Sequence, residues 1–249
     1  MTDHRKDGFL ARRLSSDEYL GLHLTVGLLV CLLLIGLFGL IAQSVEGGKA
    51  LTELDRRIGL DLQAHREREP EFRHTMIVFT EIGSPEAMTM LTVLVALALM
   101  LRRRRLRTLV WLFAMIGTAL LNVGLKHAFN RPRPDWRDPM IDEQTSSFPS
   151  GHSMGAVIAF GLLTYFILLA LYDRRERIAV VIVATVVALV IGFSRIYLGA
   201  HYFSDVVGGF AFGGAWLSVC ISGAEVVRRR AHHRQRKTVH PPPQHELGE

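Results

Sequence analysis

Apolar residues in this chain are gathered into long blocks, and charged or proline-containing segments separate them. A helix crosses a bilayer with about 20 mostly apolar residues, and the blocks approach that length. The pattern therefore predicts an all-α fold, a bundle of six transmembrane helices. The blocks at 87–101 and 178–193 are short, so these two spans need flanking residues to reach across. The predicted spans are residues 20–43, 87–101, 109–125, 154–171, 178–193 and 206–227.

Clusters of arginine and lysine lie before the first span, between alternate spans and after the last one. Short loops rich in these residues stay on the cytoplasmic side of a membrane. This places both termini in the cytoplasm, and the loops 44–86, 126–153 and 194–205 on the periplasmic or extracellular side of the inner (plasma) membrane. Most of the net charge of +6 then reflects topology, so no nucleic-acid partner is expected.

Two segments outside the spans have patterns of their own. The first loop carries apolar residues at helical spacing, with charges between them: Leu51, Leu54, Ile58 and Leu62. Such a helix can lie on the membrane surface or pack against the other loops, and both alternatives stay open. At the other end, a membrane domain over residues 1–230 is followed by a basic, proline-rich tail at 231–249, which is predicted to be disordered.

Polar segments with reactive side chains adjoin the span ends on the side opposite the arginine clusters. Lys126 directly follows the third span, and Arg133 lies further on between two prolines that stop the helix. Arg133 can therefore fold back toward the lysine. An ammonium group and a guanidinium fork both bind phosphate oxygens. Arg131 is an alternative ligand, although the spacing favours Arg133.

The stretch Phe148–Ser153, "FPSGHS", directly precedes the fourth span. Ser150 is a favoured N-cap residue, and Gly151 lets a ligand approach the backbone closely. The N–H groups and the positive dipole end of a helix that starts here bind anions. The stretch therefore predicts a phosphate cradle, with His152 beside it to supply a proton.

A histidine and an aspartate stand at the start of the sixth span. His201 and Asp205 are four residues apart, so a helix would put them on one face, where the carboxylate can hold one imidazole nitrogen protonated. The other nitrogen is then a nucleophile, and Arg195 adds a cation. Phosphoryl transfer needs a nucleophile, neutralised phosphate oxygens and a proton for the leaving oxygen. Taken alone, this His–Asp couple could equally be structural.

Together these segments resemble the three-part motif of the type 2 phosphatidic acid phosphatase family, which includes undecaprenyl pyrophosphate phosphatases, lipid A phosphatases and vanadium haloperoxidases. The segments are Lys126-x6-Arg133-Pro134, Pro149-Ser150-Gly151-His152 and Ser194-Arg195-x5-His201-x3-Asp205. The resemblance implies metal-independent hydrolysis through a phosphohistidine at His201, with Asp205 as its partner and His152 as acid and then base. The implied phosphate ligands are Lys126, Arg133, Ser150, Gly151 and Arg195.

The same resemblance implies a lipid phosphate substrate, no cofactor and no metal, with phosphate or vanadate as ligands of the site. Undecaprenyl diphosphate is the favoured substrate, and phosphatidylglycerophosphate, phosphatidic acid and lipid A are the alternatives. A transporter or lipid-binding protein would use the same cations without hydrolysis. Transporters, however, tend to carry internal repeats and broken helices near the midplane, whereas the polar residues here gather at one surface.

Overall fold

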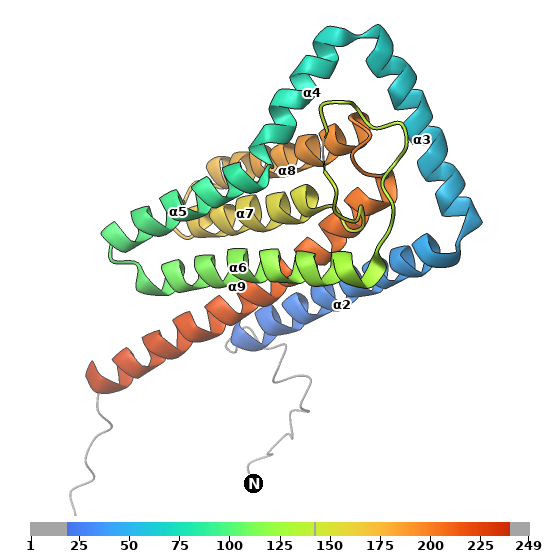
Figure 1. The fold of residues 1–249 in the computed structure, drawn as a ribbon. Coiled ribbons are helices and arrows are strands. Elements are labelled where there is room, and N and C mark those ends of the chain that lie inside the picture. Colours follow the sequence, from blue (N-terminus) through green and yellow to red (C-terminus); the bar gives the residue numbers. More distant parts are fainter. Residues whose placement is uncertain (1–18, 142, 240–249) are drawn as a thin grey trace, which may run out of the picture.

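The computed structural model describes residues 19–141 and 143–239, and this part of the chain is helical, with no strand (Figure 1). The predicted all-α class is confirmed. The helices are α2 (Tyr19–Gly47), α3 (Lys49–Arg68), α4 (Pro70–Ile82), α5 (Pro85–Leu101), α6 (Arg105–Phe129), α7 (Gly151–Leu168), α8 (Arg174–Tyr197) and α9 (Phe203–Val239).

Five single helices and one broken helix have the length and apolarity of membrane spans. The five are α2, α6, α7, α8 and α9. The remaining predicted span, 87–101, falls in α5. This helix has the length and apolarity of a span only when it is taken together with α4, and the two helices are bent by 44°. The bend has a local cause, because Pro85 begins α5 and the Ser84 hydroxyl caps it, accepting from the Ala87 N–H at 3.1 Å.

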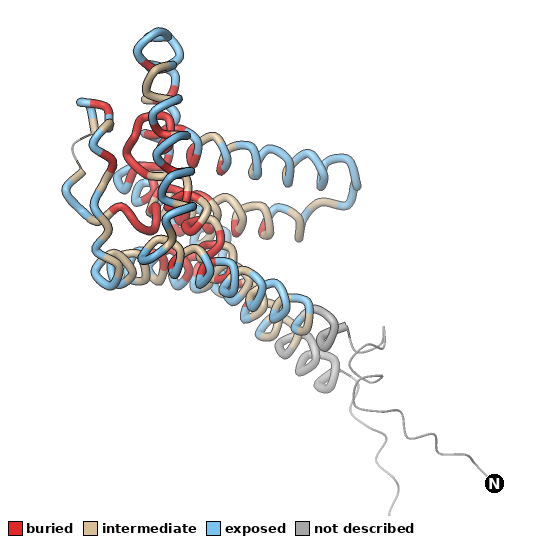
Figure 2. The backbone as a smooth tube through the Cα atoms, turned by 90° about the vertical axis from the view of Figure 1, so that its right-hand side faces the viewer, coloured by how far each residue is buried: buried red, intermediate tan, exposed pale blue. Residues whose placement is uncertain are grey.

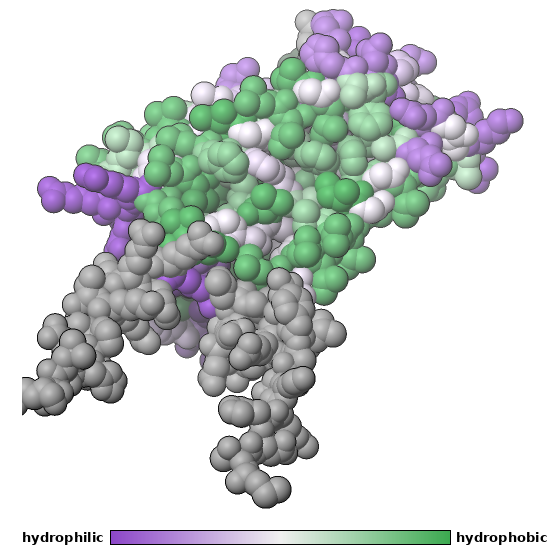
Figure 3. Space-filling model, turned by 90° about the horizontal axis from the view of Figure 1, so that it is seen from below, coloured by the Kyte–Doolittle hydropathy of each residue, from purple (hydrophilic) through white to green (hydrophobic). Residues whose placement is uncertain are grey.

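Large apolar side chains lie on the outside of the bundle. Leu33, Leu94, Leu120 and Ile182, on α2, α5, α6 and α8, are all more than half exposed. Figure 3 shows one face of the molecule as an apolar band between two polar ends. An apolar surface of this extent is stable against the acyl chains of a bilayer, so the band marks the membrane-facing part of the fold.

Buried residues are concentrated around α7. Trp111 of α6 and Met154, Ile158 and Leu162 of α7 are fully buried, and α7 packs against α6, α8 and α9. In Figure 2 the buried backbone gathers toward one end of the bundle, while the far end of the helices is exposed. The buried stretches include 147–150, 152–156 and 194–201. The densest packing therefore surrounds the segments that carry the predicted motifs.

Helices α3 and α4 form an arch that leaves the bundle at the end of α2 and returns at α5 (Figure 1). The side of α3 that faces the bundle carries polar as well as apolar residues. Asp55 and Gly59 are buried there and Leu51, Ile58 and Leu62 are half-buried, whereas Leu54 is exposed. A Cβ atom at Gly59 would lie 2.4 Å from the indole nitrogen of Trp136 in the α6–α7 loop. Helix α3 thus packs against the loops of the bundle, one of the two alternatives that its sequence leaves open.

Helix α9 continues past the last predicted span as far as Val239. The backbone is therefore helical over 231–239, the first part of the tail that composition predicts to be disordered. Arginine, glutamine and lysine in this stretch are good helix formers, and the prolines of the tail begin only at residue 241. The rest of the tail, 240–249, lies outside the described residues.

Candidate active site

The three motif segments meet at one end of the bundle (Figure 1). Lys126 lies in the last turn of α6, His152 in the first turn of α7, and His201 in the turn between α8 and α9. The α5–α6 and α7–α8 loops, where arginines cluster, lie at the opposite end. The side chains that charge patterning placed on a common side are thus neighbours in the fold.

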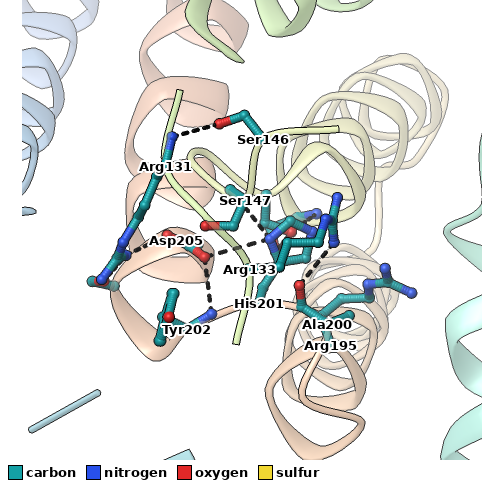
Figure 4. Close-up of polar contacts among 12 residues, drawn as sticks. Arg131, Arg133, Ser146, Ser147, Arg195, Ala200, His201, Tyr202 and Asp205 are labelled. Carbon is teal, nitrogen blue, oxygen red and sulfur yellow. Dashed lines mark hydrogen bonds and ion pairs between the residues drawn. The ribbon is translucent and has the colours of Figure 1, made fainter. Parts of the chain in front are cut away.

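The ring of His201 is buried and fixed by a backbone carbonyl. Its Nδ1 lies 2.7 Å from the carbonyl oxygen of Ser147 (Figure 4). With Nδ1 protonated and donating to this carbonyl, Nε2 carries the lone pair. Burial, with the nearby charges of Arg195 and Arg133, holds the pKa of His201 well below its usual value of 6.5. The imidazole is therefore neutral at pH 7 with Nε2 unprotonated, which is the state that a nucleophile requires.

Asp205 approaches His201 by a different geometry from the predicted one. Helix α9 begins at Phe203, so His201 lies in the preceding turn and the two residues share no helical face. Asp205 Oδ2 instead accepts from the Tyr202 N–H at 2.9 Å, as an acidic residue in the first turn of a helix often does. The same oxygen is 3.5 Å from His201 Nδ1. The carboxylate therefore supplies charge next to the ring, while the Ser147 carbonyl fixes the tautomer.

Ser150, Gly151 and His152 form the start of α7 as predicted. The Ser150 hydroxyl accepts from an N–H of the first turn at 3.4 Å. A Cβ atom at Gly151 would lie 2.7 Å from Asn122 Nδ2, so glycine is what allows α6 to approach this helix start. At Gly83, in the α4–α5 bend, a Cβ atom would lie 3.1 Å from the His152 ring. The bend therefore packs closely against His152.

Two of the predicted cations meet on one hydroxyl group. Lys126 Nζ donates to Thr145 Oγ1 at 2.9 Å, and Arg133 Nη2 donates to the same oxygen at 3.2 Å. Arg133 is also held by the Ala200 carbonyl, to which Nη1 donates at 2.8 Å. The proline-flanked arginine has thus folded back toward the lysine, as its sequence context predicts.

Arg195 supplies a third cation, 2% exposed, from the end of α8. Its Nη1 donates to Thr80 Oγ1 of α4 at 2.6 Å, and its Nη2 pairs with a carboxylate oxygen of Glu143. The other oxygen of Glu143 pairs with Arg133 Nη2 at 2.6 Å. Burial alone would raise the pKa of Glu143, but the charges of Arg195 and other nearby cations outweigh it and lower that pKa to about 2.

One buried donor in this cluster has no partner. Among the described residues, nothing accepts a hydrogen bond from Arg195 Nε. Buried donors are nearly always paired, so this atom points to an acceptor that binds here. A cavity of about 280 Å³ lies at the neighbouring loop, lined in part by Arg133, Glu143 and Thr145. Guanidinium, ammonium and helix N-terminal groups together form a site for a phosphate-like anion.

In the described part of the chain, the same neighbourhood does not have the donors of a metal site. Over residues 19–141 and 143–239, no group of three or more His, Cys, Asp or Glu side chains could hold a metal ion. The acids near the site are paired with arginines: Glu143 with Arg133 and Arg195, and Asp205 with Arg131.

Comparison with known proteins identifies the family. The model of the PAP2 superfamily matches residues 107–228, which include all three motif segments. Phosphatidylglycerophosphatase B of Bacillus subtilis is 35% identical over 147 residues, which are 59% of this chain and 72% of that protein. This chain belongs to the PAP2 superfamily. It is a membrane-bound phosphatase, and the family and enzyme class predicted from the sequence are confirmed.

Further relatives of this PAP2 protein carry related names. Lipid A 1-phosphatase of Rhizobium johnstonii is 37% identical over 118 residues, 43% of each chain. A crystal structure of a transmembrane PAP2 type phosphatidylglycerolphosphate phosphatase from Bacillus subtilis matches with a TM-score of 0.74 and 29% identity. That match covers 80% of this chain and 98% of the other. The helical bundle described above is therefore the PAP2 fold.

The candidate site brings together every residue predicted for it, and several that were not predicted. The predicted residues gathered at this end of the bundle are Lys126, Arg133, Ser150, Gly151, His152, Arg195, His201 and Asp205. Arg131, the alternative phosphate ligand, instead pairs with the carboxylates of Asp205 and Asp55. The residues that sequence reasoning missed are Asp55, Glu143, Thr145 and Ser147. Glu143, Thr145 and Ser147 lie in the irregular loop between α6 and α7, where no periodic pattern marks a residue. Glu143 is only one of several acids that follow the arginines of this loop.

Proposed function

We propose that this PAP2 protein removes the terminal phosphate of a membrane lipid through a phosphohistidine at His201, without a metal ion. The observation that carries the proposal is a neutral imidazole, fixed through Nδ1, beside a buried guanidinium whose Nε has no partner among the described residues. A nucleophile and an anion site therefore lie together. A transporter or lipid-binding protein would need the cations but not the fixed imidazole.

The first step transfers the phosphoryl group to the enzyme. The Nε2 lone pair of His201 attacks phosphorus, and the bond from phosphorus to the lipid oxygen breaks. His152 gives its proton to that leaving oxygen. As positive charge develops on the His201 ring, the Asp205 carboxylate offsets it. The proposed phosphate ligands are Lys126, Arg133, Arg195 and the helix start at Ser150 and Gly151.

The second step returns the enzyme to its starting state. Neutral His152 takes a proton from water, and the water oxygen attacks phosphorus. The bond between phosphorus and Nε2 breaks, the electron pair returns to His201, and inorganic phosphate leaves. His152 is then protonated for the next cycle. Neither step needs an electron carrier or a further co-reactant, because every proton and electron pair is accounted for by the two histidines, the substrate and water.

The proposed substrate is a lipid phosphate that reaches the site at the extracytoplasmic end of an inner (plasma) membrane bundle. Support comes from the apolar band below the site and from the charge pattern, which also predicts cytoplasmic termini. Phosphatidylglycerophosphate ranks first, because a relative and a matching structure are both named for it. Undecaprenyl diphosphate, which the sequence favoured, phosphatidic acid and lipid A are the other candidates. Phosphate and vanadate should occupy the same site.

A phosphate-release panel over these four lipids tests the proposal, with the full chain in detergent. His201→Ala should reduce release to background while the protein stays monodisperse and helical. The matched control is His127→Ala, because His127 is an exposed histidine of α6 whose Nδ1 bonds only within its own helix, to the Val123 carbonyl. Turnover retained by His201→Ala, or lost equally in both variants, would contradict the mechanism.

A further inference from the structure

Asp55 is a buried carboxylate from the first loop that lies beside the catalytic residues. It sits on α3, outside the segment that the PAP2 family model matches, and is 1% exposed. Its oxygens accept from the N–H of Ser204 at 2.9 Å and from the Ser204 hydroxyl at 2.5 Å. They also accept from Arg131 Nη2 at 2.9 Å. Nothing in the proposed phosphoryl transfer uses this carboxylate, so its burial needs another explanation.

Arg131 connects Asp55 to the carboxylate of the catalytic pair. Its Nη1 donates to Asp205 Oδ1 at 2.5 Å, while Nη2 is taken by Asp55. The guanidinium carbon also lies 4.0 Å from the centre of the Tyr202 ring. Figure 4 shows Arg131 reaching from the loop toward Asp205, with Tyr202 beside it. One guanidinium is thus shared between two carboxylates from different helices.

This sharing determines which oxygen of Asp205 is available to His201. Oδ1 accepts from Arg131, whereas Oδ2 accepts from the Tyr202 N–H and faces His201 Nδ1 at 3.5 Å. A guanidinium prefers to bind a single carboxylate through two parallel hydrogen bonds. With Asp55 occupying Nη2, Arg131 has only one terminal nitrogen left for Asp205. Oδ2 therefore stays with the imidazole.

We propose that Asp55 is a positioning residue that acts through Arg131 to keep one oxygen of Asp205 directed at the nucleophilic histidine. Helix α3 of the first loop is then part of the catalytic apparatus and not only a cover over it. This proposal rests on the phosphohistidine mechanism proposed above. It assigns no contact with substrate to either Asp55 or Arg131.

A second ionic contact holds the same arch to the same loops without touching Asp205. Arg66 of α3 donates to the carbonyls of Tyr197 and Trp136 at 2.8 and 2.7 Å. Asp138 Oδ2 accepts a hydrogen bond from Arg73 Nε of α4 at 2.6 Å and lies 3.5 Å from Arg66 Nε. Asp138→Asn therefore weakens the docking of the arch while leaving Asp205 and Arg131 as they are. It is the matched control for Asp55→Asn.

The experiment compares Asp55→Asn with Asp138→Asn in the full chain in detergent. Kinetics are measured with the panel substrate that the wild type hydrolyses fastest, across pH, together with thermal unfolding. Asp55→Asn should lower kcat by about tenfold or more, because small displacements of catalytic groups have effects of that size, while KM changes less than about twofold. Asp138→Asn should lower the unfolding temperature and leave kcat near the wild-type value.

The pH profile separates positioning from stability. Asp55→Asn removes a negative charge near His201 and lets Arg131 neutralise both oxygens of Asp205, so the acidic limb of kcat/KM should move to lower pH. Asp138→Asn should not move that limb. The charged groups that face His201 are the same in both variants: Lys126, Arg133, Glu143, His152, Arg195 and Asp205.

A double-mutant cycle tests whether Asp55 acts through Arg131. Adding Asp55→Asn to Arg131→Gln should change kcat by less than about twofold, because Arg131→Gln already removes the guanidinium that links Asp55 to Asp205. Additive losses would overturn the proposal, as would equal losses of kcat in Asp55→Asn and Asp138→Asn. If Asp55→Asn does not fold, Arg131→Lys replaces it, since lysine keeps the charge but cannot divide two fixed nitrogens between two carboxylates. Wild-type kcat and an unmoved acidic limb in Arg131→Lys then overturn it. Failure of the mechanism itself appears separately, as turnover retained in His201→Ala.

Discussion

Replacing Glu143 by glutamine tests how the substrate-free protein fills its phosphate site. The two carboxylate oxygens of Glu143 pair with Arg133 and Arg195, the same guanidinium groups that are proposed to bind phosphate. The Glu143 carboxylate thus occupies the position proposed for the phosphate group, and a substrate must displace it. Because nearby cations lower the pKa of Glu143 to about 2, it remains charged across the working pH range, and its competition with phosphate should not vary with pH there.

The size of the effect follows from the contacts that are exchanged. A hydrogen bond to a charged group contributes about 1.5–3 kcal/mol net, and Glu143 makes two ion-paired contacts. Its side chain is 32% exposed, so solvent weakens each of the two pairs to about 0.75 kcal/mol, within the range of solvent-exposed ion pairs. Displacing the carboxylate then costs about 1.5 kcal/mol, which corresponds to roughly a tenfold change in affinity.

The assay measures KM for a short-chain lipid phosphate and the inhibition constants of orthophosphate and vanadate. Glu143→Gln should lower all three by about tenfold with kcat nearly unchanged, because the competing charge is gone while the cations remain. Glu53→Gln is the matched control, since Glu53 is a half-exposed acid of α3 that pairs with Arg57 away from the site. A higher KM in Glu143→Gln would refute the reasoning, because it would show that the carboxylate holds the arginines in their binding positions.

Three further predictions concern the histidines and the start of α7. His152→Ala should slow a lipid substrate far more than an activated aryl phosphate, whose leaving oxygen needs no proton; equal losses in phosphate release would contradict its role as an acid. The pKa of His201 lies below 6.5, so its protonation should remove activity only as pH falls through that lowered value. The acidic limb of kcat/KM should therefore lie below pH 6.5. A limb above that pH in steady-state assays would exclude His201 as its source. Gly151→Ala should lower both the activity and the free energy of unfolding, the latter by about 1–3 kcal/mol because the helix start becomes overpacked. Adding Asn122→Ala should restore part of the activity and part of the stability, because it removes the side chain that the new Cβ meets at 2.7 Å.

Much of this fold could be predicted because its signals are local in sequence. Apolar blocks mark the spans, and arginine clusters mark one end of the bundle. Together they were enough to place Lys126, His152 and His201 near one another before any tertiary contact was known. The one span without a single straight helix, 87–101, was also the shortest apolar block. The bend before it follows from a helix start at Ser84-Pro85, which can be recognised in the sequence.

The geometry within the site was less predictable because it depends on where a helix begins. Spacing of four residues puts two side chains on one face only inside a helix. Here α9 begins at Phe203, so His201 stands outside it and its Nδ1 donates to a loop carbonyl. A backbone carbonyl leaves no trace in side-chain patterns. For this reason the sequence identified Asp205 as the partner of His201 and could not reveal Ser147.

The first loop shows why hydrophobic periodicity could not reveal the buried carboxylate of α3. Periodicity assigns the apolar stripe to the interior because a core is usually apolar. The surroundings of α3, however, are the polar loops of an anion site, which present Arg131 and Ser204 as donors. A carboxylate is stable when buried among such donors, and a leucine would leave them without partners. Asp55 is therefore buried on the same side of α3 as the half-buried apolar residues Leu51, Ile58 and Leu62. In a membrane enzyme whose active site lies at the end of the bundle, the buried side of a loop helix can therefore include an acidic residue that pairs with the donors of the site, and such a residue is the first to examine for a part in catalysis.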